Sequence, residues 1–167
     1  MNSLQKALLA SGLVSKPLKP VANLPTRQKS INSVPNPLPI PNICCHCGSN
    51  VTLVDNAQIY GKPYGNWPYA YLCSSSKCFS YVGLHPYTLI PLGSLATASM
   101  RNARKKAKAV FNPLWESGNM TRSEAYIWLA GELGIINTEE CHIGWFDVET
   151  CNKVITICEL KHSENTI

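Results

Sequence analysis

The sequence lacks an apolar run of membrane-spanning length, about 20 residues for a helix, because polar residues or prolines interrupt every hydrophobic stretch. It also lacks a secretory signal, since residues 1–14 have no charged start, no long apolar run and no small-residue cleavage site. These absences exclude a membrane-spanning protein and predict a soluble protein that stays in the cytoplasm.

Acidic residues are missing from residues 1–40, which carry five basic residues. Residues 41–100 hold two bases and one acid, and residues 101–167 hold eight bases and nine acids. The formal net charge of +5 therefore comes from the leading segment. Basic residues clustered in this way favour a polyanionic partner such as nucleic acid more than the net charge alone does.

Cysteine is abundant, with 8 in 167 residues, and four of the cysteines form two spaced pairs. Cys44 and Cys47 have the two-residue spacing of a zinc knuckle, and Gly48 supplies the backbone freedom that this turn needs. Cys73 and Cys78 enclose four residues and offer a slightly longer second turn. The segment between the pairs is long enough for a hairpin that brings four sulfurs to one tetrahedral centre. The spacing predicts a structural Zn²⁺ site with four ligands: Cys44, Cys47, Cys73 and Cys78.

Two alternatives to a metal site fit this pattern less well. Buried free thiols do not explain two paired clusters on either side of hairpin-like sequence, and disulfides need an oxidising compartment that no export signal indicates. Cys45 and His46 lie inside the first turn, and spacing leaves open whether either replaces one of the four ligands. A site closed by four cysteines has no position for substrate or activated water, which argues against a metalloenzyme.

The leading segment is expected to be a flexible tail. A short helix candidate covers residues 3–14, with Ser3 as its cap and Gly12 at its end. Seven of the 12 prolines fall within residues 17–41. Closely spaced prolines favour an extended, semi-rigid linker.

The segment around the cysteine pairs is expected to form strands. Residues 51–54 and 58–60 flank the turn signal at Asp55 and predict a β-hairpin. Further strands are expected at residues 69–73, entering the second turn, and at 79–82, leaving it. The region is rich in aromatic residues: Tyr60, Tyr64, Trp67, Tyr69, Tyr71, Phe79 and Tyr81. Such rings either stack on unpaired bases or form the small core that covers the metal.

A basic amphipathic helix is expected after the ribbon, with Ser94 as its N-cap. Its buried stripe would be Ala96, Met100, Ala103, Ala107 and Val110. Four basic residues at spacings i, i+3, i+4 and i+7 share another face: Arg101, Arg104, Lys105 and Lys108. Like charges at these spacings repel by about 0.2–0.5 kcal/mol per pair. The face is therefore either simply solvated or in contact with a polyanion.

Two further helices are expected in the C-terminal part. Thr121 and Glu124 form a capping box that starts the first of them, and Gly134 ends it. Asp147 caps the last helix, whose core-facing positions include Cys151 and Cys158.

Two other interpretations of this part are weaker. A second metal site formed by Cys141, His142 and Cys151 matches no standard zinc spacing. Residues 124–146 have the outline of a DNA-binding helix-turn-helix, but the second helix would carry acidic residues and no basic residue to face phosphate.

Taken in order, these features predict an α+β fold in which a small four-cysteine zinc ribbon is followed by about three helices. Residues 1–41 form the flexible, basic, proline-rich tail, and residues 42–92 form the ribbon. Residues 93–160 form the helical region, and residues 161–167 are a disordered C-terminus.

Several motifs occur along the chain in a recognisable order. They are Cys44-x-x-Cys47-Gly48, Ile59-Tyr-Gly61, the Cys73/Cys78 pair, Tyr81-Val-Gly-x-His85, Pro91-Leu-Gly93, Arg101-x-x-Arg104, Phe111-x-Pro-Leu-Trp115, Arg122-x-x-Ala-Tyr126-x-Trp-Leu129 and Cys141-His-Ile-Gly-x-Phe-Asp147. Together they resemble a zinc-finger-containing domain family of unknown function that is found in phages and prophages, over about residues 42–155. The resemblance implies a zinc finger followed by helices, the same four cysteines as zinc ligands, and a bacterial host cytoplasm as the location.

These observations predict an accessory protein without enzymatic activity that binds DNA or RNA through the basic helix and the tail. The alternative is a protein-interaction module that docks on a host or phage complex. An enzyme is not indicated, because His85 and His142 are the only plausible general bases and neither lies in a recognised nucleophile motif. Cys141 beside His142 suggests a thiol–base pair, but adjacent residues in a helix point about 100° apart.

Overall fold

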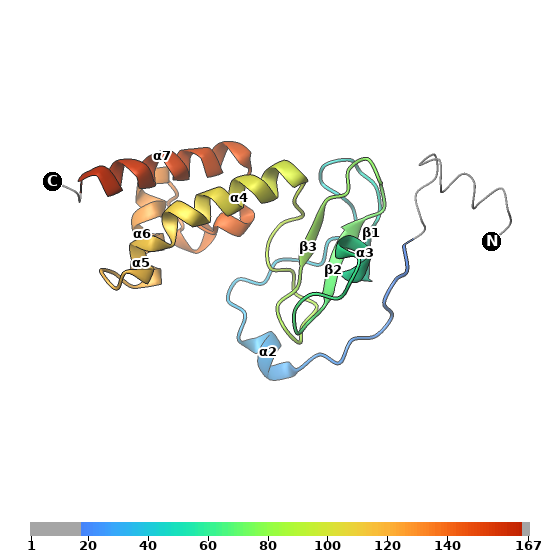
Figure 1. Ribbon diagram of the computed structural model, residues 1–167. Helices are drawn as coiled ribbons and strands as arrows, with labels where there is room; N and C mark the ends of the chain where they lie inside the picture. Colours follow the sequence, from blue (N-terminus) through green and yellow to red (C-terminus); the bar gives the residue numbers. More distant parts are fainter. Residues whose placement is uncertain (1–17, 165–167) are drawn as a thin grey trace, which may run out of the picture. The chain divides into compact units, whose positions relative to one another are not determined.

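The structure, a computed structural model, describes residues 18–164, and the helix expected over residues 3–14 lies outside this range. The chain divides into two compact units, with the boundary between Leu95 and Ala96. The first unit contains the β-sheet and the second contains the long helices (Figure 1). The architecture is α+β, as the sequence predicts.

Three antiparallel strands form the sheet of the first unit in the order β1-β2-β3. They are β1 (Val51–Asp55), β2 (Tyr69–Cys73) and β3 (Tyr81–Gly83). Tyr71 lies opposite Leu53 on one side and Val82 on the other. Because β2 is the central strand, four of its five residues are buried, and its last residue, Cys73, is held inside the unit.

The β-hairpin that the sequence predicts around Asp55 is wrong in its second strand. Residues Ala57–Tyr60 form a helical turn, α3. The Asp55 carboxylate accepts a hydrogen bond from the Ala57 amide at 2.7 Å, and the Gln58 side chain forms hydrogen bonds with the backbone of Lys19. An Asp that bonds the amide two residues later favours a helical turn over a hairpin turn. The partner of β1 is therefore β2.

Part of the proline-rich segment, which the sequence predicts to be a linker, contacts the edge of this sheet. Pro20 forms an antiparallel bridge with Val54, and the Val21 amide donates to the Leu53 carbonyl at 2.9 Å. A short helix, α2 (Gln28–Asn32), follows. Pro20 fits this position because β1 is an edge strand, where a residue without an amide proton is tolerated.

The second unit contains α-helices and 3₁₀ helices. They are α4 (Ala98–Phe111), α5 (Pro113–Glu116), α6 (Arg122–Leu133), η1 (Thr138–Glu140), η2 (Ile143–Trp145) and α7 (Val148–Glu164). Helices α4 and α7 lie side by side (Figure 1). They run in the same direction, because Arg104 contacts the residue before Asp147 while His162 lies 3.0 Å from the Val110 carbonyl. None of the described helices combines the length and the apolar character needed to cross a membrane.

Several predicted helix ends are confirmed. The capping box of Thr121 and Glu124 is formed in both directions at the start of α6. Gly134 ends this helix with a φ of +70°, a left-handed conformation in which a Cβ is unfavourable. The Asp147 carboxylate accepts a hydrogen bond from the Thr150 amide at 2.8 Å and caps α7.

Two details of the helical region, the start of α4 and the end of α7, differ from the sequence prediction, and the weaker helix-turn-helix interpretation does not hold. The N-cap of α4 is Thr97 rather than Ser94, and its hydroxyl accepts a hydrogen bond from the Met100 amide. No helix-turn-helix forms, because α6 is followed by the short 3₁₀ helices η1 and η2 instead of a second α-helix. The helical region was expected to end at residue 160 and to be followed by a disordered C-terminus, but helix α7 continues to Glu164. Residues 165–167 lie outside the described range.

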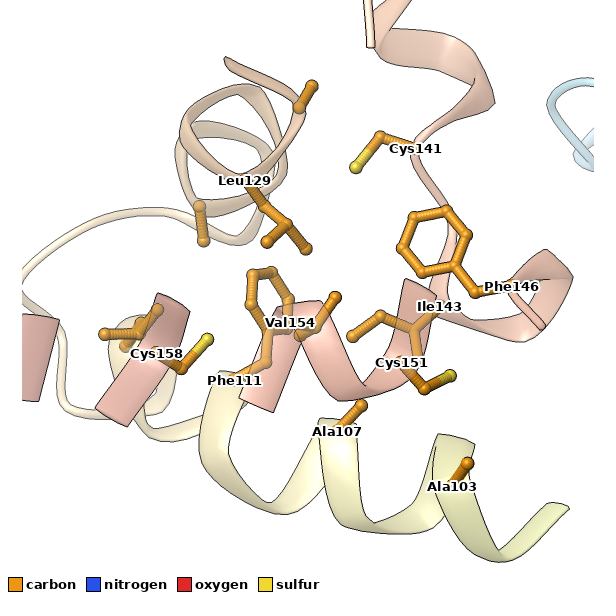
Figure 2. Close-up of a cluster of buried hydrophobic side chains, with 13 residues drawn as sticks. Ala103, Ala107, Phe111, Leu129, Cys141, Ile143, Phe146, Cys151, Val154 and Cys158 are labelled. Carbon is orange, nitrogen blue, oxygen red and sulfur yellow. The ribbon is translucent and has the colours of Figure 1, made fainter. Parts of the chain in front are cut away.

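Side chains from α4, α6, α7 and the 3₁₀ segment converge in the core of the second unit, as Figure 2 shows. Phe111, Leu129 and Val154 are fully buried there. Cys151 and Cys158 occupy core positions, as the sequence predicts, and pack as small apolar groups.

Candidate metal centre

The first pair of predicted ligands lies in a tight turn before β1. The Gly48 amide donates to the Cys44 carbonyl at 2.9 Å, and the Cys44 amide donates to the Ser49 carbonyl at 2.8 Å. Gly48 has a φ of +71°, which glycine adopts without the steric cost that a Cβ would add. The turn places the sulfurs of Cys44 and Cys47 within 4.8 Å of each other.

The second pair lies at the end of β2 and in the turn before β3. The Phe79 amide donates to the Ser75 carbonyl at 2.9 Å, so Ser75 occupies the position that Cys44 has in the first turn. Phe79 has a φ of +45°, a left-handed conformation like that of the glycine in the first turn. The ligand comes instead from Cys73, two residues earlier on the strand, which explains the longer spacing to Cys78.

The four sulfurs form one compact group. All of them lie within 4.8 Å of one another. The Sγ atoms of Cys44 and Cys78 are 3.7 Å apart, and those of Cys47 and Cys73 are 3.4 Å apart. A tetrahedral ion with metal–sulfur bonds of about 2.3 Å needs sulfur pairs about 3.8 Å apart, so the group has the dimensions of a zinc site. Within residues 18–164, no other set of three or more His, Cys, Asp or Glu side chains is grouped closely enough to hold a metal ion.

Hydrogen bonds around Cys44 favour negative charge on its sulfur. The hydroxyl oxygen of Ser80, which is fully buried, lies 3.2 Å from Cys44 Sγ and 3.4 Å from Cys78 Sγ. Burial acts to raise the pKa of the Cys44 thiol, but hydrogen bonds from Ser80 and from the amides of His46 and Cys47 outweigh it, and the pKa is lowered. Ser80 therefore connects a ligand from each turn.

Two other sulfurs have pKa values shifted in opposite directions. Hydrogen bonds from the hydroxyl and the amide of Ser49 lower the pKa of the Cys47 thiol to about 6. Burial raises the pKa of the Cys73 thiol to about 12, and the nearby sulfurs of Cys47 and Cys44 add to the rise. A bound dication favours the thiolate form of all the ligands. Metal binding and loss of the thiol protons are therefore coupled at this site.

The two residues that spacing left open do not belong to the group. His46 Nε2 lies 2.9 Å from the Leu95 carbonyl oxygen. Cys45 is exposed and lines an apolar cleft with Ile43. The structure therefore groups Cys44 with Cys47, and neither Cys45 nor His46 replaces one of the four predicted ligands.

The four basic residues predicted to share a face of α4 have different surroundings. Arg104 is buried, and its Nε donates to the Phe146 carbonyl at 2.8 Å. Arg101 is partly buried, and its guanidinium donates to the Ala96 carbonyl. Arg104 thus differs from the predicted solvent-facing position, because its guanidinium lies against the segment that leads into α7. The exposed basic residues of this helix are Lys105, Lys106 and Lys108.

The second metal site considered from the sequence does not form. Cys141 and Cys151 are fully buried in the apolar core of the second unit. Burial raises the pKa of the Cys141 thiol to about 11, so it stays protonated at neutral pH. A protonated thiol without solvent contact is a poor nucleophile.

Sequence reasoning missed the part that Ser80 has in the metal centre. Ser80 lies two residues after Cys78, but Ser74, Ser75 and Ser76 precede that cysteine. With so many serines nearby, position along the chain does not identify the one whose hydroxyl reaches two sulfurs.

Comparison with curated proteins and with solved structures gives no match. A family model for a zinc-finger-containing domain matches residues 40–161. This range includes all four clustered cysteines and most of the helical unit. The chain therefore belongs to the family of zinc-finger-containing domains, and its four-cysteine cluster is a metal-binding centre.

Proposed function

We propose that the chain is a nucleic-acid-binding accessory protein without enzymatic activity, in which Zn²⁺ held by the four clustered cysteines stabilises the ribbon. An all-thiolate tetrahedral set is typical of structural zinc, and it leaves no open coordination position for a substrate. In line with the family resemblance, we place this function in a phage or prophage setting, in the cytoplasm of a bacterial host.

The observation that carries the proposal is the exposed lysine face of α4. Lys105 and Lys108 are exposed with Lys106 between them, and the helix has no acidic residue between Ala98 and Phe111. Exposed cations without neighbouring acids are not neutralised within the helix, so they remain available to phosphates. Arg104 is buried, and Arg101 is partly buried and donates to the Ala96 carbonyl. The proposed phosphate contacts on this helix are therefore the lysines, and the basic residues of segment 1–40 add charge.

Exposed aromatic rings on the ribbon support unpaired bases as part of the ligand. Tyr64 and Tyr60 are 72% and 50% exposed, and Phe79 is 39% exposed. Their rings make successive edge-to-face contacts. The ring centroid of Tyr60 lies 5.8 Å from that of Tyr64 and 5.9 Å from that of Tyr81, and the centroids of Tyr81 and Phe79 are 6.3 Å apart. Trp67, Tyr69 and Tyr71 pack into or against the core of the ribbon. Solvent-exposed rings suit base stacking, which needs single strands.

The proposal is tested by fluorescence anisotropy with labelled single-stranded and duplex DNA and RNA over a range of salt concentrations. We expect binding that weakens steeply with salt and favours single strands. In the Lys105→Gln, Lys108→Gln double variant, the slope of log affinity against log salt should fall by about 1.4–1.8, at about 0.7–0.9 per phosphate contact. The control is Lys153→Gln, which removes an exposed cation from α7. No binding at low salt, or binding indifferent to salt, contradicts the proposal.

A second candidate, a protein-interaction module, is favoured by an apolar cleft in the ribbon unit. The cleft has a volume of about 220 Å³ and includes Ile40 and Ile43, which are 47% and 58% exposed. Exposed apolar residues next to a cleft are typical of protein contacts. A pull-down from host lysate with and without nuclease separates the two candidates, because a partner held through nucleic acid is lost on nuclease treatment and a directly bound protein is retained.

A further inference from the structure

A cavity in the helical unit is lined by none of the metal-binding residues. It has a volume of about 310 Å³ and is formed by the first turns of α6 and by the 3₁₀ segment that follows. Its polar and aromatic lining is Arg122, Ser123, Tyr126, Thr138, Glu139 and His142. This volume lies at the lower end of the range for sites that bind small ligands. Two motifs singled out in the sequence, one beginning at Arg122 and one containing His142, meet here.

The cavity contains one strong cation whose position is set by aromatic rings. The Arg122 guanidinium carbon lies 5.4 Å from the centre of the Tyr126 ring and 5.9 Å from that of Trp115. These cation–π contacts orient the planar guanidinium, which also donates a hydrogen bond to the Tyr126 hydroxyl. A guanidinium carries five N–H donors, so donors remain for a ligand. Arg122 is exposed at the first residue of α6. Its fork of donors therefore suits a phosphate group that enters from solvent.

Two fixed rings line the cavity next to this cation. The centroids of Tyr126 and His142 are 5.8 Å apart, and His142 also packs against Trp145 at 4.4 Å. The ring of Phe111 packs against that of Tyr126, with their centroids 4.7 Å apart. Burial, with a contribution from Arg122, lowers the pKa of His142, so its ring is neutral at pH 7. Fixed neutral rings beside a cation can contact a flat aromatic group as well as an anion.

The remaining polar residues limit the charge of the ligand. Ser123 and Thr138 offer hydroxyl groups, whereas Glu139 contributes an acidic side chain. A carboxylate on the lining repels additional phosphates, so one phosphate is favoured over a chain of them.

We propose that this cavity binds a nucleoside monophosphate group, with Arg122 on the phosphate and the rings of Tyr126 and His142 against the base. The same chemistry is offered by a free nucleotide and by the phosphorylated end of a single strand. Only the strand-end form rests on the nucleic-acid-binding function proposed above.

The test is NMR titration of the zinc-loaded, ¹⁵N-labelled full chain with AMP, adenosine and inorganic phosphate. We expect AMP to shift the amides of Ser123, Tyr126, Thr138 and His142, and to bind about tenfold more tightly than adenosine or phosphate alone. AMP affinity should fall about tenfold in Arg122→Gln. The matched control is Lys161→Gln, which also removes a cation over an indole ring, that of Trp128, but does not line the cavity.

A second variant changes the affinity in the opposite direction. Glu139 is exposed on η1, so Glu139→Gln leaves the core intact and should strengthen ATP binding relative to AMP. The inference is overturned if AMP shifts no amides in the cavity, if Arg122→Gln binds AMP like the unmodified chain, if phosphate alone binds as tightly as AMP, or if Glu139→Gln leaves the ATP preference unchanged.

Oligonucleotides distinguish the two sources of the ligand. Tighter binding of a 5′-phosphorylated strand than of its unphosphorylated form supports recognition of a strand end, and equal binding supports the free nucleotide. If AMP binds the cavity but no oligonucleotide binds at low salt, the inference holds for the free nucleotide and the proposed function fails. The Lys105→Gln, Lys108→Gln variant should retain AMP binding while losing affinity for strands.

Discussion

Replacing Ser80 with alanine should weaken metal binding although Ser80 is not a ligand. Its hydroxyl oxygen lies 3.2 Å from the sulfur of Cys44 and 3.4 Å from that of Cys78, and its side chain is fully buried. In Ser80→Ala no water takes the place of the hydroxyl without rearrangement, so one thiolate loses a hydrogen bond. A hydrogen bond to a charged group contributes about 1.5–3 kcal/mol. This corresponds to a loss of zinc affinity of about 10–100-fold, which is the typical loss when a residue that hydrogen-bonds to a metal ligand is replaced.

The affinity is measured by competition with a chromogenic chelator at fixed pH. The matched control is Ser76→Ala, which removes an exposed serine hydroxyl from the turn between Cys73 and Cys78 and should leave the affinity unchanged. If Ser80→Ala binds zinc within about twofold of the unmodified chain, the hydroxyl does not stabilise the thiolates and this reasoning is refuted.

Zinc affinity should decrease as the pH falls, because protons compete with the ion for the sulfurs. The slope of log zinc affinity against pH should increase by one below about pH 6, because Cys47, whose pKa is lowered to about 6, is then also protonated in the metal-free chain. Competition titrations between pH 5 and 8 measure this slope, and a slope that stays constant contradicts the prediction. Gly48→Ala should destabilise the ribbon by about 1–2 kcal/mol, since the φ of +71° is unfavourable with a Cβ although nothing lies within 4 Å of it. Gly131→Ala, inside α6 and also without a neighbour within 4 Å, should instead stabilise the chain by about 0.5–1 kcal/mol. Thermal or denaturant unfolding compares the two glycine variants, and changes of the same sign contradict the explanation.

The metal cluster was predictable because its determinants are local. A C-x-x-C turn followed by Gly48 fixes the geometry of two sulfurs within five residues, and a second pair after a strand supplies the others. The capping box at Thr121 and the left-handed end at Gly134 were predictable for the same reason, since each depends on a few neighbouring residues.

The errors arose where tertiary contacts decide between local alternatives. Asp55 is compatible with a hairpin turn or with the start of a helical turn. The helical turn forms because the Asp55 carboxylate accepts a hydrogen bond from the Ala57 amide and the Gln58 side chain accepts one from the Lys19 amide. Arg104 has the spacing of a surface residue, but the Phe146 carbonyl, distant in sequence, satisfies its guanidinium in the core. Likewise, no local pattern indicates that the segment after Pro17 reaches Val54 at the sheet edge.

The central claim is tested most directly by the zinc content of the purified chain, measured by elemental mass spectrometry on the unmodified chain and on cysteine variants. We expect one zinc ion per chain, almost none in Cys73→Ser, and full content in Cys151→Ser, whose sulfur lies in the apolar core of the helical unit. A metal-free chain whose ribbon stays folded, or a Cys73→Ser variant that keeps its zinc, would contradict the account.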